Sequence, residues 1–120
     1  MQQATDIQAD TVTVMTTCPD DGTARQIARA LVSERLAACV QRVPGVQSTY
    51  VWKGELQEDQ EVLLLIKTLK NSLPVLAERV RSLHPYEVPE LLVVPVYSGN
   101  EAYAEWVRSS VETSMPSQSK

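Results

Sequence analysis

Along the first third of the chain, the spacing of apolar residues changes from a period of two to a period of three or four. Residues 12–18 carry an apolar or threonine side chain at alternate positions, which predicts a strand because successive side chains point to opposite faces of a sheet. From residue 24 the apolar side chains recur at the period of one helix face. These side chains belong to Ala24, Ile27, Ala28, Leu31 and Val32. Asp20 or Asp21 is placed to cap this helix, because a carboxylate accepts hydrogen bonds from the free N–H groups of the first turn.

The next segments predict a long β-hairpin. Residues 37–43 predict a second strand, Pro44–Gly45 interrupts it as a bulge or bend, and the strand resumes over residues 46–52. Residues 53–55 predict the turn, with a glycine at its tip. The third strand returns over residues 56–66 and ends in an unbroken apolar run. Such a run is typical of a central strand that is covered on more than one side.

A second helix, a fourth strand and a short third helix complete the pattern. Asn71 or Ser72 can cap the second helix, and Pro74 suits its first turn. Its apolar stripe consists of Leu73, Leu76, Ala77, Val80 and Leu83. Residues 91–96 predict a strand at a sheet edge, because Pro95 has no N–H group to donate to a neighbouring strand. The last helix carries Tyr103, Trp106, Val107 and Val111.

The order strand, helix, strand, strand, helix, strand, helix predicts an α+β domain. Two strand–helix–strand units joined by a hairpin describe a ferredoxin-like βαββαβ sandwich, here with an extra C-terminal helix. We expect the domain to span residues 11–112, between flexible polar tails at residues 1–10 and 113–120.

In that fold both main helices cover one face of the sheet and leave the other face bare. Tyr50, Trp52 and alternate residues of the hairpin must then bury their apolar surface elsewhere, because small domains seldom expose large apolar patches. We therefore expect self-association through the open sheet face and the hairpin edge. The edge strands could also pair between subunits, which would remove their tendency to aggregate.

Composition narrows the classes of protein to consider. The 120 residues suit one domain, and the net charge of −4 offers no basic surface to nucleic acid or anionic lipid. No apolar stretch is long enough to cross a bilayer, and the first residues lack a secretory signal, so we expect a cytoplasmic protein without a membrane partner. Cys18 and Cys39 are far apart, which favours free thiols and argues against a closed zinc site.

The only histidine, His84, stands in the segment 84–90, where Pro85 ends the preceding helix. A single histidine at a helix end is usually a capping or packing residue. The functional alternative is a ligand for a soft metal ion or a contact to a small molecule in a cleft. Motif matches of this kind need their structural context before the alternatives can be separated.

A set of short motifs is spread over residues 12–111 without an obvious gap. They are Thr17-Cys18-Pro19-Asp20, Ala28-Arg29-Ala30-Leu31-Val32, Leu36-Ala37-Ala38-Cys39-Val40, Pro44-Gly45-Val46, Tyr50-Val51-Trp52-Lys53-Gly54, Glu61-Val62-Leu63-Leu64, Ile66-Lys67-Thr68, His84-Pro85-Tyr86-Glu87-Val88-Pro89-Glu90 and Tyr103-Ala104-Glu105-Trp106. Taken together they resemble the CutA divalent-cation-tolerance family. The resemblance implies a ferredoxin-like protomer in a tight homotrimer similar to PII signalling proteins. It also implies a link to tolerance of copper and other divalent metals, with copper binding in some relatives.

Candidate metal ligands are Cys18 and His84, with Cys39 third. Thiolate and imidazole suit copper, and three soft ligands are too few for structural zinc, so a weakly bound copper ion, not required for folding, is the expected cofactor. The following helix N-terminus would favour a Cys18 thiolate, although Asp20 and Asp21 oppose that effect. The alternative for Cys39 is a small buried hydrophobic residue.

A second candidate site is a small-molecule cleft. Lys67 needs solvent or a carboxylate, and Glu61, Glu87 or Glu90 could pair with it, either structurally or to hold a small anionic ligand between subunits. Trp52 and Tyr86, with other aromatic residues, could line such a cleft. Their alternative role is packing at an interface, since aromatic side chains bury a large area.

Two functions therefore remain open. The first is a homotrimeric cytoplasmic protein of divalent metal tolerance that responds to metal ions and binds copper through thiol and imidazole groups. The second is a PII-like binding module that holds a small anionic ligand between subunits. We do not expect an enzyme. Acylphosphatases share this fold class, but residues 12–22 lack the arginine and asparagine that such a phosphate site needs.

Overall fold

The structure, a computed structural model, describes residues 10–111. Its elements in chain order are β1 (Thr11–Cys18), α2 (Asp21–Ser33), β2 (Cys39–Trp52), β3 (Glu55–Leu69), the 3₁₀ turn η1 (Lys70–Ser72), α3 (Leu73–Leu83), β4 (Leu92–Pro95) and α4 (Glu101–Ser110). The two tails expected at residues 1–10 and 113–120 lie outside the described residues, apart from Asp10.

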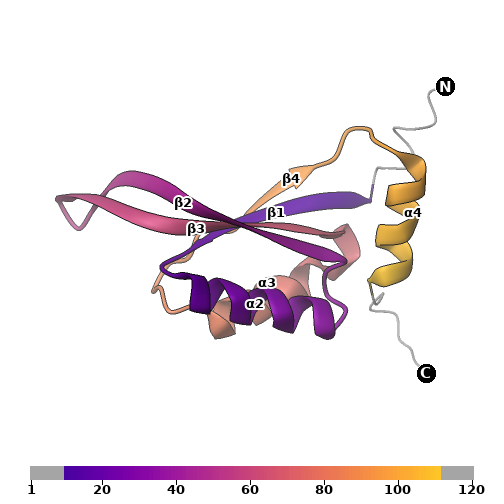
Figure 1. Ribbon diagram of the computed structural model, residues 1–120, viewed down its shortest axis with the longest axis horizontal. Helices are drawn as coiled ribbons and strands as arrows, with labels where there is room; N and C mark the ends of the chain where they lie inside the picture. Colours follow the sequence, from indigo (N-terminus) through magenta and orange to yellow (C-terminus); the bar gives the residue numbers. More distant parts are fainter. Residues whose placement is uncertain (1–9, 112–120) are drawn as a thin grey trace.

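The described strands form one antiparallel sheet in the order β2-β3-β1-β4. Helices α2 and α3 lie side by side on one face of this sheet, and α4 lies across its end, opposite the hairpin tip (Figure 1). This arrangement confirms the predicted α+β, ferredoxin-like fold with an extra C-terminal helix. Strand β4 is an outer strand of the described sheet, as Pro95 predicted.

The core lies between the sheet and the two main helices. Val14, Leu64 and Ile66 are fully buried on the helix-facing side of β1 and β3, opposite Ile27 of α2 and Leu76 of α3. Strand β3 pairs with β1 on one side and β2 on the other, so it is a central strand, as its unbroken apolar run predicted. The apolar face of the sheet and the apolar stripes of the two helices therefore meet in one packed layer.

The hairpin of β2 and β3 extends well beyond the helices (Figure 1). Its register shifts between Val43 and Val46, so the Pro44–Gly45 bulge is confirmed, and Gly45 there has a φ of 77°. At the tip, Lys53 and Gly54 both have positive φ, 52° and 82°. Positive φ at both central residues is typical of a two-residue turn that follows the twist of the strands.

Three local predictions change in detail. Asp20 rather than Asp21 caps α2, since its Oδ1 accepts a hydrogen bond from the backbone N–H of Thr23 at 2.7 Å. Val32 was expected in the buried stripe of α2 but is 42% exposed, although the preceding Leu31 is fully buried, because Val32 lies at the edge of that stripe. Ser72 precedes α3 but its side chain makes no capping hydrogen bond, because η1 already begins the helical turn.

Helix α4 closes the end of the sheet. Val107 and Val111 pack with Leu69 and Ala38 in a second, smaller apolar cluster. Arg35, whose φ is 62°, reaches across and donates hydrogen bonds to backbone carbonyls of Ser109 and Ser110. These contacts leave the opposite end of the sheet, with the hairpin, free of α4.

The face of the sheet away from α2 and α3 carries exposed apolar side chains. Tyr50 and Trp52 on the hairpin are 40% and 42% exposed, and Leu92 on β4 is 56% exposed. Among the described residues, no helix has both the length and the apolar character needed to span a bilayer.

Candidate ligand site between the hairpin and the 84–91 loop

His84 ends α3 and fastens the following loop to β1. Its Nε2 lies 2.7 Å from the backbone carbonyl of Thr17, and its Nδ1 accepts a hydrogen bond from the backbone N–H of Tyr86 at 3.2 Å. A carbonyl can only accept and a backbone N–H can only donate, so the tautomer of His84 that carries its proton on Nε2 satisfies both contacts. The side chain is 8% exposed. Capping and packing, the structural alternative for this residue, are therefore present in the fold.

Tyr86 is the next fixed point of the loop. Its hydroxyl donates a hydrogen bond to Oε2 of Glu61 at 2.6 Å, and Glu61 is 6% exposed. Burial, followed by this bond to a carboxylate, raises the pKa of Tyr86 well above its usual value. The hydroxyl therefore stays protonated and continues to donate. The bond joins the loop to β3 at the base of the projecting hairpin.

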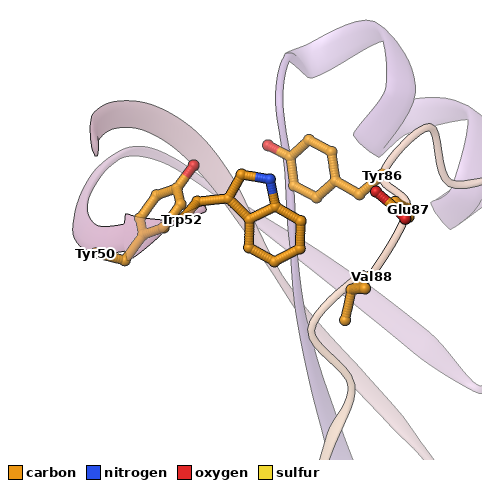
Figure 2. Close-up of a pocket in the computed structure, with 5 residues that line it drawn as sticks. All are labelled: Tyr50, Trp52, Tyr86, Glu87 and Val88. Carbon is orange, nitrogen blue, oxygen red and sulfur yellow. The ribbon is translucent and has the colours of Figure 1, made fainter. Parts of the chain in front are cut away.

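A pocket lies where this loop meets the hairpin. It encloses about 180 Å³ and is lined by Tyr50, Trp52, Tyr86, Glu87 and Val88. Figure 2 shows the Trp52 indole directed towards the loop segment that carries the last three of these residues. Tyr50 and Trp52 are two residues apart on β2 and so share one face of the hairpin. The volume is many times the roughly 10–15 Å³ that one water molecule needs on this measure.

Two carboxylates are tied to the tyrosines of the pocket, in addition to Glu87 in its lining. The Tyr50 hydroxyl donates a hydrogen bond to Asp59 at 2.5 Å, as the Tyr86 hydroxyl does to Glu61. Burial and the nearby Glu61 raise the pKa of Glu90 above its usual range. The surroundings of the pocket are therefore more favourable to a positive than to a negative charge.

Lys53 at the hairpin tip places a positive charge beside two residues of the pocket. Its Nζ lies 5.8 Å from the centroid of the Trp52 ring and 3.9 Å from a carboxylate oxygen of Glu87. The Lys53 and Glu87 side chains are 73% and 75% exposed, so this ion pair is weak and easily exchanged. Lys67 is not part of this group. It lies on the open sheet face and donates to Gln41 Oε1 at 2.8 Å.

The two cysteines are in different surroundings. Cys18 is fully buried at the end of β1, and burial, with Asp20 and Glu61 nearby, raises the pKa of its thiol to about 11. Of the two opposing effects named from the sequence, the one that disfavours a thiolate agrees with these surroundings, in which burial acts first and the carboxylates of Asp20 and Glu61 add to it. Cys39 is partly exposed on β2, opposite Lys67. Within residues 10–111, no three or more histidine, cysteine or acidic side chains are grouped closely enough to hold a metal ion.

Sequence reasoning found part of the pocket. Trp52, Tyr86 and Glu87 line it, and Glu61 supports it through Tyr86, whereas Cys18, His84, Cys39 and Lys67 do not line it. Asp59 was not singled out. A signal for it exists, because Asp59 pairs with Ser48 and is thus a diagonal neighbour of Tyr50 on the same face of the hairpin.

Comparisons with known proteins agree with the motifs. A sequence model described as "CutA1 divalent ion tolerance protein" matches residues 12–110. The chain belongs to this family. A "Divalent-cation tolerance protein CutA" from Thermus thermophilus is 54% identical over 97 residues, which are 81% of this chain and 94% of that protein. "Protein CutA" of Homo sapiens is 50% identical over 97 residues, but the match spans only 54% of its length.

Solved CutA structures share the fold. The Thermus thermophilus protein superposes with a TM-score of 0.83 at 51% identity, covering 85% of this chain and 99% of that chain. "CutA1 from Oryza sativa" superposes with a TM-score of 0.85 at 40% identity, covering 88% of this chain and 97% of the other. A curated rice relative, 39% identical over 112 residues that cover 93% of this chain and 63% of that protein, is named "Protein CutA 1, chloroplastic". Family membership therefore does not decide in which compartment this chain works.

Proposed function

We propose that this chain is a homotrimeric divalent-cation tolerance protein that works as a binding module, with its ligand site at the pocket between hairpin and loop. The observation that carries this proposal is the way the pocket is held. Tyr86, one of its walls, is fixed by a hydrogen bond to the buried Glu61 and by the contact of its backbone N–H with His84. A rigid concave site with aromatic walls and a few placed polar groups is typical of small-molecule binding. We propose no catalytic activity for it, and place the protein in the cytoplasm.

The proposed assembly uses the open sheet face. Exposed aliphatic side chains on β2 and β4 need a partner, and copies of the same chain provide one with matching edges. We expect sedimentation to give a trimer. Leu92 on β4 is 56% exposed and does not line the pocket, so Leu92→Ala should weaken the trimer by about 1 kcal/mol or more without removing a pocket wall.

Val75→Ala is the control for that substitution, because Val75 on α3, on the other side of the sheet, is 50% exposed, close to the 56% of Leu92. It should leave the trimer more stable than Leu92→Ala does. A monomer at micromolar concentration, or equal effects of the two substitutions, would contradict the proposed interface.

Ligand binding at the pocket can be tested by thermal shift with the full chain. A ligand present at 100 times its dissociation constant adds about 2.7 kcal/mol of stability. A panel should include inorganic anions, small carboxylates, organic cations and divalent metals. A shift that is present in the wild type and lost in Trp52→Ala would support the site. The absence of any shift across the panel would argue against a binding module.

Copper binding is the second candidate function. The observation in its favour is the hydrogen bond from His84 to the carbonyl of Thr17, which brings the imidazole beside the residue preceding Cys18. To bind copper, His84 would have to give up one of its present partners and the buried Cys18 would have to lose a proton. The affinity for copper(I), measured by titration against a competing chelator, should then be lower in Cys18→Ser and His84→Ala than in the wild type. Cys39→Ser tests the third ligand. Unchanged stoichiometry in all three variants would exclude these residues.

A further inference from the structure

The pocket between hairpin and loop has an aromatic interior. Of its lining residues, Tyr50, Trp52 and Tyr86 present rings, and Val88 adds an apolar surface. Ring faces carry partial negative charge, so they attract a cation within about 6 Å of the ring centroid, and tryptophan does so most strongly. Groups of aromatic rings around one cavity are typical of sites for ammonium ions that carry methyl groups.

The polar groups of the pocket point to the same charge. None of the described residues that line it is positively charged, and Glu87 contributes a carboxylate. Both tyrosine hydroxyls already donate their hydrogens, to Asp59 and to Glu61. A hydroxyl whose hydrogen is used can only accept further hydrogen bonds, so neither tyrosine can donate to an anion without breaking an existing bond.

Lys53 shows which chemistry this surface accepts. Its ammonium group lies 5.8 Å from the Trp52 centroid and 3.9 Å from a Glu87 oxygen. The chain thus supplies an ammonium ion of its own to the same ring and the same carboxylate that line the pocket. Because Lys53 is 73% exposed and its ion pair is long, it can withdraw into solvent at little cost.

We propose that this pocket binds an organic ammonium ion, with the cation between the Trp52 ring and the Glu87 carboxylate, in competition with Lys53. This inference rests on the proposed function in that it uses the same pocket, and it replaces the anionic ligand expected from sequence with a cationic one. A methylated ammonium fits better than a hydrated divalent metal, because it loses its water readily and gains contact with Val88 and the rings. A metal ion would need a set of donor atoms that the described residues do not group together.

The two tryptophans allow a direct test by NMR on the full chain. Each has one indole N–H signal, and the signals are assigned by comparing wild type with Trp52→Leu and Trp106→Leu. Tetramethylammonium chloride should shift the Trp52 signal and leave that of Trp106 in place. Sodium chloride at the same ionic strength controls for salt, and tert-butanol controls for a neutral molecule of similar size.

Further variants separate the contributions. Lys53→Gln removes the internal competitor and should tighten tetramethylammonium binding about two- to five-fold, the range of a cation–ring contact at an exposed site. Glu87→Gln should weaken binding. Trp52→Leu, followed through the ligand signal, should weaken it about 2- to 30-fold, and Trp106→Leu should not change it. Because Lys53 and Glu87 are exposed, their substitutions test the proposal even if Trp52→Leu disturbs the fold.

The outcomes distinguish this inference from the proposed function. If inorganic phosphate shifts Trp52 and tetramethylammonium does not, the pocket remains a ligand site and the ammonium proposal is refuted. If neither probe shifts Trp52, and the thermal-shift panel is also negative, both proposals fail. Equal shifts with tert-butanol would show an apolar pocket without charge selection, and looser binding in Lys53→Gln would refute the competition with Lys53.

Discussion

The hydrogen bond between Tyr86 and Glu61 should be the main stabilising contact of the pocket wall. Tyr86→Phe removes only the hydroxyl, keeps the ring, and leaves the nearly buried Glu61 carboxylate without this donor. Hydrogen bonds to charged groups contribute about 1.5–3 kcal/mol, and an unpaired buried acceptor costs a similar amount. We therefore expect the free energy of unfolding to fall by about 1.5–3 kcal/mol.

Thermal unfolding followed by circular dichroism measures this effect. For a domain of about 100 residues each kcal/mol lowers the melting temperature by about 4–8 °C, so the shift should be about 6 °C at the least. Wild type and variant must be compared at one protein concentration, since assembly makes the melting temperature depend on concentration.

Tyr97→Phe is the matched control, because Tyr97 is 79% exposed. It should change the stability by no more than about 0.5 kcal/mol, as is usual for surface substitutions. In a Glu61→Gln background the penalty of Tyr86→Phe should shrink, since a buried amide without a donor costs less than a buried carboxylate. A Tyr86→Phe variant as stable as Tyr97→Phe would refute the reasoning.

Three further predictions follow from the described contacts. Cys39 should react with a thiol reagent at pH 8, while the buried Cys18, with its pKa raised to about 11, should react only on unfolding. Equal labelling rates of the two cysteines in the native state would contradict the burial of Cys18. Asp20→Ala should lower the melting temperature, because hydrogen bonds to Thr23 stabilise the charged Asp20 and lower its pKa. The difference in melting temperature between wild type and variant should disappear in acid, as pH falls through that lowered pKa. A difference independent of pH would exclude the charged cap. Ile27→Ala should cost about 2–5 kcal/mol in urea unfolding, since Ile27 is fully buried, and a cost below 1 kcal/mol would mean that the core collapses around the gap.

The sequence predicts the fold of this chain more completely than its candidate site. The elements were predictable because each depends on neighbours in the chain: the alternation in β1, the helical stripe around Ile27 and the interruption at Pro44–Gly45 are local signals. Val32 was misplaced because it lies at the edge of the apolar stripe of α2, next to the fully buried Leu31. The width of the stripe that is buried is set by packing and not by the period of the stripe.

The site was only partly predictable. The aromatic and acidic residues were recognised as candidates, and Lys67 was grouped with carboxylates, whereas within this chain its Nζ donates to Gln41 on the neighbouring strand. The thiol of Cys18 was judged from its neighbours in the chain, the following helix and the opposing Asp20 and Asp21. Its surroundings also include Glu61 from β3, which raises its pKa together with burial and Asp20.

The sequence by itself determined which segments become strands, helices and turns, because hydrophobic period, capping residues and positive-φ glycines act over a few neighbouring residues. It also determined the family, through motifs that cover most of the chain. Only the tertiary structure decided that Tyr86 meets Glu61 and that Lys53 meets Glu87, because those pairs are brought together by the projection of the hairpin past the loop. The proposed preference of the pocket for a positive charge follows from these long-range contacts, and no local pattern in the chain encodes it.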